Sequence, residues 1–179
     1  MWYNKMIICH KSRSGVCRTA VAQIIHRPEK EPVMIYTPLT KKALRLCFDA
    51  HREQVDKTGL PYVFHPFHLA EQMKDEATTV CALLHDVVED TDYTLDDLRA
   101  MGFPADVVDA LALLTHDPAV PYMDYVGEIA KNPIARKVKM ADLRHNSDLS
   151  RMDEVDERAL RRTEKYKKAL AYLKRHVPR

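Results

Sequence analysis

The sequence predicts an all-α fold, a helical bundle, and three observations support this. Apolar residues recur every three or four positions along most of the chain after residue 36, as they do on a helix with one buried face. Proline or a capping side chain stands where several of these stretches begin. No stretch alternates apolar and polar residues as a half-buried strand would.

Composition limits the class of protein. The chain has 179 residues, 46% of them apolar, which suffices for one domain with a hydrophobic core. No apolar run is long enough to span a membrane and no signal-peptide pattern is present, so we expect a soluble, cytoplasmic protein. The four cysteines stand at positions 9, 17, 47 and 81 without a CxxC pair, which favours reduced thiols over a zinc site.

Residues 1–33 differ from the rest of the chain. They carry a net charge of +4 and little periodicity, whereas residues 34–179 carry −2. We expect 1–33 to be a poorly ordered leader or an upstream extension of the coding frame, with a basic arm as the alternative. Residues 34–179 should form the single domain, whose charge alone does not predict nucleic-acid binding.

The first helix should begin at Thr37 and Pro38, an N-cap followed by a proline in the first turn. Its apolar stripe runs to about Val55, and the glycine and proline of KTGLPY, residues 57–62, break it. In His65-Pro66, the proline predicts extended geometry for His65 and the start of a second helix. His65 would then stand at the N-terminal end of that helix. Without the other motifs, it would be interpreted as a hydrogen-bonded loop histidine.

The stretch CALLHDVVEDT, residues 81–91, interrupts a run of core residues with four polar side chains. If it is one helix, His85 and Glu89 lie one turn apart, and so do Asp86 and Asp90. A solvated helix end is the alternative reading. The other His-Asp pair, at residues 116–117, precedes a proline and lacks an acidic pair one turn later, so it reads as a helix terminus.

Five further helices follow from periodicity and capping signals. They should cover the following ranges: Thr94 to near Gly102, Pro104 to about Leu114, Tyr122 to before Pro133, Pro133 to about Asp148, and Asp153 to about Arg175. The last helix should turn Val155, Ala159 and Leu173 inward. Its opposite face is basic and mostly solvated, although a few side chains at its start could meet an anionic ligand.

Asp142 falls within the apolar stripe of the helix that starts at Pro133, and His145 and Asn146 lie beside it. A carboxylate directed into an apolar seam is unfavourable unless it is paired or binds a metal. A salt bridge to a lysine or arginine would satisfy it as well as a metal would.

Several of these motifs, in order, resemble the HD superfamily of metal-dependent phosphohydrolases. YVFHP around His65, LLHDVVEDT at 83–91 and KMADLRHN at 139–146 are similar to the hydrolase half of the RelA/SpoT alarmone enzymes. AHREQ around His51 and KTGLPY before the HP motif match as well. The resemblance covers about residues 36–170 and leaves no room for a synthetase domain, so it points to the small stand-alone alarmone hydrolases.

The resemblance implies a metal centre and an acidic pair. His65, His85, Asp86 and Asp142 match the ligands of one ion, usually manganese in this family, and two imidazoles with two carboxylates suit Mn²⁺. Glu89 and Asp90 match the acidic pair that handles the attacking water and the leaving group.

The resemblance also implies a nucleotide site. Lys57, Tyr62 and Asn146 match positions beside the guanosine, and Tyr166 matches a substrate-contacting tyrosine. Many relatives carry a basic residue just before the lysine, where this chain has Asp56. We therefore expect weaker discrimination between guanine and adenine alarmones than in relatives with arginine there.

The leading prediction is a Mn²⁺-dependent hydrolase that removes the 3′-diphosphate of ppGpp or pppGpp, giving GDP or GTP and pyrophosphate. Its partner would be a small-molecule nucleotide, with no nucleic acid and no membrane; the oligomeric state is not predicted. One alternative keeps the centre with another substrate: ppApp, NADPH or a nucleoside monophosphate. The other is a non-catalytic nucleotide-sensing regulator.

Overall fold

The computed structural model describes residues 36–176, so the expectations for residues 1–33 lie outside the described part of the chain. Within it the chain forms nine α-helices and one 3-10 turn. These are α1 (Pro38–Ala50), α2 (Phe64–Ala70), α3 (Glu76–Leu84), α4 (Val87–Asp90), α5 (Leu95–Ala100), α6 (Ala105–Leu114), α7 (Tyr122–Lys131), α8 (Pro133–Asn146), η1 (Leu149–Arg151) and α9 (Glu157–Arg175). Residues 36–176 form no β-strand, only an isolated bridge between Val55 and Pro61. The all-α prediction is confirmed.

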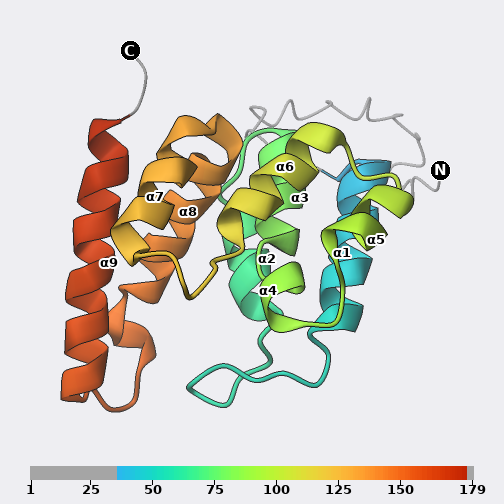
Figure 1. Cartoon of the computed structure of the whole chain (residues 1–179). Coiled ribbons are helices and arrows are strands. Elements are labelled where there is room, and N and C mark those ends of the chain that lie inside the picture. The colour runs from blue at the N-terminus through green and yellow to red at the C-terminus, as the bar shows by residue number, and fades with distance from the viewer. Residues whose placement is uncertain (1–35, 177–179) are drawn as a thin grey trace, which may run out of the picture. The chain divides into compact units, whose positions relative to one another are not determined.

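Helix α3 is the centre of the bundle (Figure 1). All of its residues from Thr78 to Leu84 are buried, because α1, α2, α6 and α8 pack around it. The sequence of α3, in which the two threonines are the only polar residues after Glu76, suits burial on every side. Helix α9 lies at one edge of the bundle, against α7 and α8, and its exposed side carries the basic residues.

The predicted helix starts have the expected chemistry. The Thr37 hydroxyl accepts from the backbone N–H of Thr40, and Pro38 occupies the first turn of α1. Thr94 caps α5 in the same way, with Asp97 completing the capping box. Asn132 precedes Pro133 and accepts from the first N–H groups of α8. Each cap satisfies backbone donors that have no partner inside the helix.

Three helix ends differ from the prediction. Helix α1 stops at Ala50 rather than near Val55, and α8 stops at Asn146 rather than Asp148. Helix α9 begins at Glu157, four residues later than expected, because η1 follows α8 and Asp156 is the N-cap that starts α9. Val155 therefore precedes the helix and is exposed instead of facing inward.

The predicted extended geometry of His65 is wrong, because His65 is the second residue of α2. A proline in the first turn of a helix is tolerated, since the N–H groups there have no intrahelical partner anyway. A turn that begins at Pro61 leads into α2, with the backbone N–H of His65 donating to the carbonyl of Tyr62 at 2.9 Å. This early position in the helix directs His65 into the interior.

The interpretation of residues 81–91 as one continuous helix is also wrong. Helix α3 ends at Leu84 and the four-residue helix α4 starts at Val87. His85 Nδ1 lies 2.9 Å from the carbonyl oxygen of Ala82, the acceptor that the Asp86 N–H would use in an unbroken helix. The break allows His85 and Asp86 to point toward the same centre instead of lying side by side on a helix surface.

Two composition-based expectations concern residues within the described range. Cys47 and Cys81 are free and buried, and burial raises the pKa of the Cys47 thiol to about 12. Cys9 and Cys17 lie outside the described residues. Over residues 36–176, no helix combines the length and apolar character required to cross a membrane.

Candidate functional site

Three of the predicted metal ligands meet at the core of the bundle. His65 on α2, His85 at the end of α3 and Asp142 on α8 each place a ligand atom within 4.8 Å of the others. The Nε2 atom of His65 lies 3.4 Å from Asp142 Oδ1. All three side chains are buried, with relative exposures of 6%, 3% and 4%. Side chains more than seventy positions apart in the sequence therefore form one compact group.

Asp86, the fourth predicted ligand, lies beside this group. Its Oδ2 atom is 3.0 Å from His85 Nε2 and 3.8 Å from His65 Nε2, and it also accepts the hydroxyl of Tyr62. Tyr62 thus lies against a carboxylate of the cluster, in addition to lining the pocket described below.

The outer nitrogens of both histidines are fixed by hydrogen bonds. His85 Nδ1 donates to the Ala82 carbonyl, which leaves Nε2 as the atom with a free lone pair. His65 Nδ1 lies 2.7 Å from His145 Nδ1, which is also 3.0 Å from the donor Nη1 of Arg151. Since a guanidinium can only donate, His145 Nδ1 is an acceptor and His65 Nδ1 carries the proton. Both Nε2 atoms are therefore available as ligands, the arrangement typical of metal-binding histidines.

The two carboxylates of the cluster outnumber its single lysine. Although burial opposes ionisation, the Lys139 ammonium and the two imidazoles lower the pKa of Asp142, and Lys139 Nζ lies 2.9 Å from Asp142 Oδ2. Burial likewise favours neutral His85, but the Asp86 carboxylate raises its pKa to about 9. Although Asp86 Oδ2 lies 3.0 Å away, the buried Nε2 atom of His85 makes no hydrogen bond. Two carboxylates and two imidazoles beside one lysine fit a divalent cation, which would bind His85 in place of its second proton.

The acidic pair Glu89 and Asp90 lies at the exposed rim of the cluster. Glu89 Oε2 accepts from the backbone N–H of His116 at 3.1 Å, and the Asp90 carbonyl accepts from Gln54 Nε2 at 2.8 Å. Partial burial and the charges of Asp86 and Glu89 raise the pKa of Asp90. A carboxyl group with a raised pKa can hold a proton for a leaving group.

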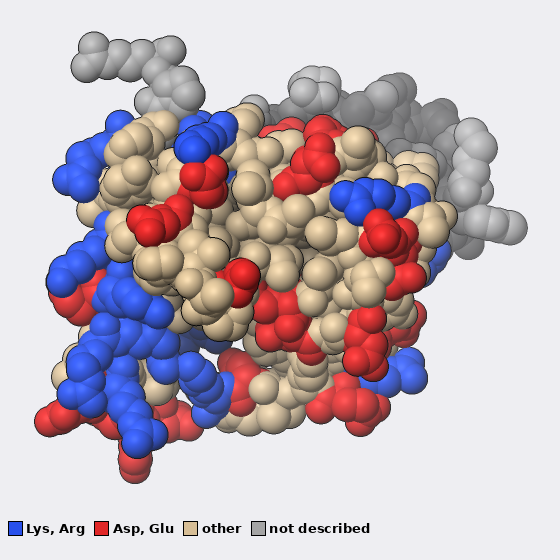
Figure 2. Space-filling view, in the orientation of Figure 1, with Lys and Arg blue, Asp and Glu red and all other residues tan. Residues whose placement is uncertain are grey.

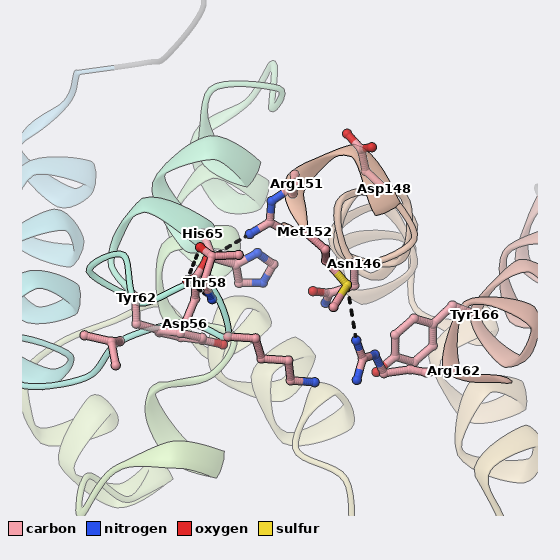
Figure 3. A pocket seen from close by; sticks show the side chains of 12 residues that line it. Asp56, Thr58, Tyr62, His65, Asn146, Asp148, Arg151, Met152, Arg162 and Tyr166 are labelled. Carbon is pink, nitrogen blue, oxygen red and sulfur yellow. Dashed lines mark hydrogen bonds and ion pairs between the residues drawn. The ribbon is translucent and has the colours of Figure 1, made fainter. Parts of the chain in front are cut away.

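A pocket lined by His65 of the cluster extends toward Arg162 and Tyr166 of α9 (Figure 3). Its cavity volume is about 210 Å³, and it contains all four predicted nucleotide contacts, Lys57, Tyr62, Asn146 and Tyr166. Asn146 also donates to Asp142 Oδ1 and so joins the pocket to the cluster. Figure 2 shows basic side chains gathered over α9 and acidic side chains facing them across a hollow.

The structure adds residues that the sequence analysis did not single out. Lys139 pairs with Asp142, and their spacing of three residues on a helix was a signal that could have been used. Arg151 and Arg162 line the pocket. Arg162 was one of many basic residues on its helix, and Arg151 sits in a turn with no periodic signal. Only the tertiary fold distinguishes these two arginines from the solvated ones.

His116 and Asp117 follow the end of α6 and take no part in the cluster, as the sequence predicted. The backbone of His116 nevertheless holds Glu89, and its ring packs 4.5 Å from that of Tyr125. The second His-Asp pair is thus a helix terminus that supports the site from outside.

Curated relatives of known name match this chain. Over 115 residues it is 36% identical to the mouse and the human "Guanosine-3′,5′-bis(diphosphate) 3′-pyrophosphohydrolase MESH1", covering 56% of this chain and 64% of each relative. Over 157 residues it is 36% identical to a "GTP pyrophosphokinase" of Streptomyces coelicolor, covering 77% of this chain. The chain spans only 17% of that longer relative. No protein-family model matches.

A solved structure supports the fold. The structure titled "A metazoan ortholog of SpoT hydrolyzes ppGpp and plays a role in starvation responses" matches with a TM-score of 0.64 at 24% identity. The match covers 78% of this chain and 87% of that one. The named relatives confirm the resemblance that the motifs indicated, and the solved structure confirms the helical fold.

Proposed function

We propose that this chain, whose relatives confirm its resemblance to the HD-type ppGpp hydrolases, removes the 3′-diphosphate of ppGpp or pppGpp. The products would be GDP or GTP and pyrophosphate. The observation that carries this proposal is that a buried His-His-Asp cluster borders an open pocket lined by basic and aromatic side chains. We further propose that residues 34–179 form the working domain and that it acts in the cytoplasm.

The metal half of the proposal concerns the cluster residues. His65, His85, Asp86 and Asp142 would hold one ion, and oxygen and imidazole ligands favour Mn²⁺ among the available divalent ions. When bound, the ion would supply Lewis-acid activation of the phosphate and the water. His145 and the Ala82 carbonyl would keep the ligand nitrogens of the two histidines aimed inward.

The proton-handling half concerns the acidic pair. Glu89, held by the backbone of His116, would orient the attacking water and accept its proton. As the water oxygen bonds to phosphorus, the bond between phosphorus and the 3′ oxygen breaks. Asp90, whose pKa is raised by partial burial and by the charges of Asp86 and Glu89, would deliver a proton to the departing 3′ oxygen.

The pocket would bind the nucleoside and its 5′-phosphates. Among residues 36–176, neither Lys57 nor Arg162 forms an ion pair with a carboxylate, although both line the pocket. Burial and the nearby Arg162 lower the pKa of Lys57, as expected where two cations share a site for an anion. Tyr62 and Tyr166 offer ring surface to the sugar and base.

The decisive experiment is hydrolysis of a nucleotide panel with Mn²⁺, with Mg²⁺ and after chelation. The panel holds ppGpp, pppGpp, ppApp, NADPH and GMP, and the assay detects pyrophosphate and inorganic phosphate separately. We expect pyrophosphate from ppGpp and pppGpp with Mn²⁺ present. If phosphate is released from NADPH or GMP and neither ppGpp nor pppGpp is hydrolysed, the proposed substrate is wrong. Tight ppGpp binding without any hydrolysis would indicate a sensor.

A further inference from the structure

The pocket contains one arginine whose charge is already neutralised. Arg151 Nη2 lies 3.2 Å from Asp56 Oδ2, and its Nη1 lies 3.2 Å from the carbonyl oxygen of His145. The side chains of Arg151 and Asp56 are 31% and 16% exposed, so both still border the open pocket. The guanidinium is therefore held in its own plane by two partners from different parts of the chain.

Asp56 does not offer its charge to the pocket as a free carboxylate. Its Oδ1 atom accepts from the backbone N–H groups of Thr58 and Leu60 and from the Thr58 hydroxyl, at 2.8, 3.1 and 2.6 Å. These hydrogen bonds and Arg151 lower its pKa although burial opposes them. Asp56 therefore presents no uncompensated negative charge to the pocket.

The cations of the pocket fall into two kinds. Lys57 and Arg162 form no ion pair within the described range, although the Asp156 carboxylate lies near enough to Lys57 to oppose the lowering of its pKa, and this suits contact with phosphate. Arg151 has its carboxylate, so it offers little net charge to an anion. A guanidinium whose edges are occupied can still stack on an aromatic ring through its flat face.

We propose that Arg151 packs against the purine base of the nucleotide, and that Asp56 is the residue that positions it. The proposal rests on the proposed nucleotide substrate and names what recognises its base. The loop before His65 and the turn after α8 together form this wall of the pocket, opposite Arg162 and Tyr166 (Figure 3). Base recognition thus depends on a contact between residues 95 positions apart.

The test compares ppGpp with 1-deoxyribose 3′,5′-bis(diphosphate), which keeps the sugar and both diphosphates but lacks the base. For Arg151→Ala we expect KM for ppGpp to rise about tenfold, from lost stacking, with the base-free compound changed less than about twofold. Arg151→Lys should behave like Arg151→Ala, because lysine keeps the charge but not the flat face. Arg144→Ala, an exposed arginine on α8 outside the pocket, is the matched control.

Asp56→Asn tests the positioning role. Asparagine keeps an acceptor for Thr58 and Leu60 but removes the charge opposite Arg151. The KM for ppGpp should therefore rise more than the KM for the base-free compound. The manganese content should stay unchanged. An equal change of KM for both compounds in Arg151→Ala would overturn the proposal, because Arg151 would then act on phosphate or through His145 on the cluster. Unchanged kinetics in Arg151→Ala would overturn it as well.

Failure of the proposed reaction is a separate outcome. If the wild-type protein with Mn²⁺ hydrolyses neither compound, the hydrolase proposal fails. The base contact is then tested by calorimetry, which measures the binding of GDP and of base-free ribose 5-diphosphate. A selective loss of GDP affinity in Arg151→Ala would support the inference in that case. Equal losses for both ligands would contradict it.

Discussion

The metal cluster and the nucleotide pocket are adjacent, but they are built in opposite ways. His65, His85 and Asp142 are at least nine-tenths buried; His65 and Asp142 sit on helices that pack against α3, and His85 ends α3 itself. Lys57, Asn146 and Arg151 lie on a loop, at a helix end and in a 3-10 turn, and they retain access to solvent. A buried ligand set is held in place by packing, whereas an open pocket is held by a few hydrogen bonds and ion pairs.

This difference predicts how the two regions respond to substitution. Changes in the cluster should remove the ion and cost stability together, since a buried charge would lose its partner. Changes in the pocket should alter substrate affinity while the fold and the ion remain. The following variants test that separation, from the largest expected effect to the smallest.

Asp142→Ala should abolish manganese binding and activity. It also leaves the Lys139 ammonium, whose side chain is only 16% exposed, without its partner at 2.9 Å, so stability should fall by about 3–5 kcal/mol. The double variant Asp142→Ala with Lys139→Met removes the stranded charge and should recover a folded helical protein that still binds no metal. Metal content by mass spectrometry and thermal unfolding measure both effects; full manganese occupancy in either variant would refute the ligand assignment.

Glu89→Gln should keep the ion, the fold and substrate affinity, yet lower kcat by roughly two to four orders of magnitude. The reason is its exposed position at the rim of the cluster, where it can reach water without being part of the buried ligand group. Asp92→Asn, an exposed acid on the same segment, is the control. Loss of manganese from Glu89→Gln would place Glu89 among the ligands instead.

Lys57→Ala should raise KM for ppGpp about tenfold and leave kcat and manganese content near the wild-type values. Lys57 is an exposed loop cation that faces the pocket rather than the cluster. Because an ionic contact is screened by salt, the KM difference should shrink as ionic strength rises. A loss of kcat at unchanged KM would mean that the pocket and the cluster are not separable.

Asp75→Ala should have the smallest effect, confined to stability. Asp75 caps α3 by accepting from the Thr78 N–H, and its loss should cost about 1 kcal/mol without changing KM. Although burial opposes it, hydrogen bonds from Lys137 and Thr78 lower the folded-state pKa of Asp75. The contribution of the Asp75 carboxylate to folding stability is therefore fully present above its unfolded-state pKa of about 3.9. It is lost as the pH falls through the folded-state pKa.

Urea unfolding from pH 7 to pH 3 measures that dependence. The stability difference between wild type and Asp75→Ala should shrink below about pH 4, because the unprotonated carboxylate is the form that caps the helix. Asp75→Asn keeps a cap acceptor, so it should lose only the pH-dependent part of the stabilisation that Asp75 provides. A difference that stays constant down to pH 3 would show that the carboxylate charge contributes nothing.

The two His-Asp pairs show what sequence reasoning could reach. His85-Asp86 and His116-Asp117 have the same two-residue sequence, but only the first is followed by two acidic residues one turn later. The structure shows the same distinction, because the first pair joins the cluster and the second follows a helix end. The geometry assumed for the first pair was nevertheless wrong. A single helix would have spread His85 and Asp86 over its surface, whereas the break after Leu84 brings both to one centre.

The sequence by itself determined the helical class, most helix starts and the anomaly of Asp142, because periodicity, caps and an acid in an apolar stripe are local signals. It also supplied the motifs whose resemblance the named relatives confirm. The tertiary structure alone decided that Arg151 pairs with Asp56 and that His116 holds Glu89. Both contacts join residues far apart in the chain, and both depend on which segments the packed helices bring together, which no local pattern encodes.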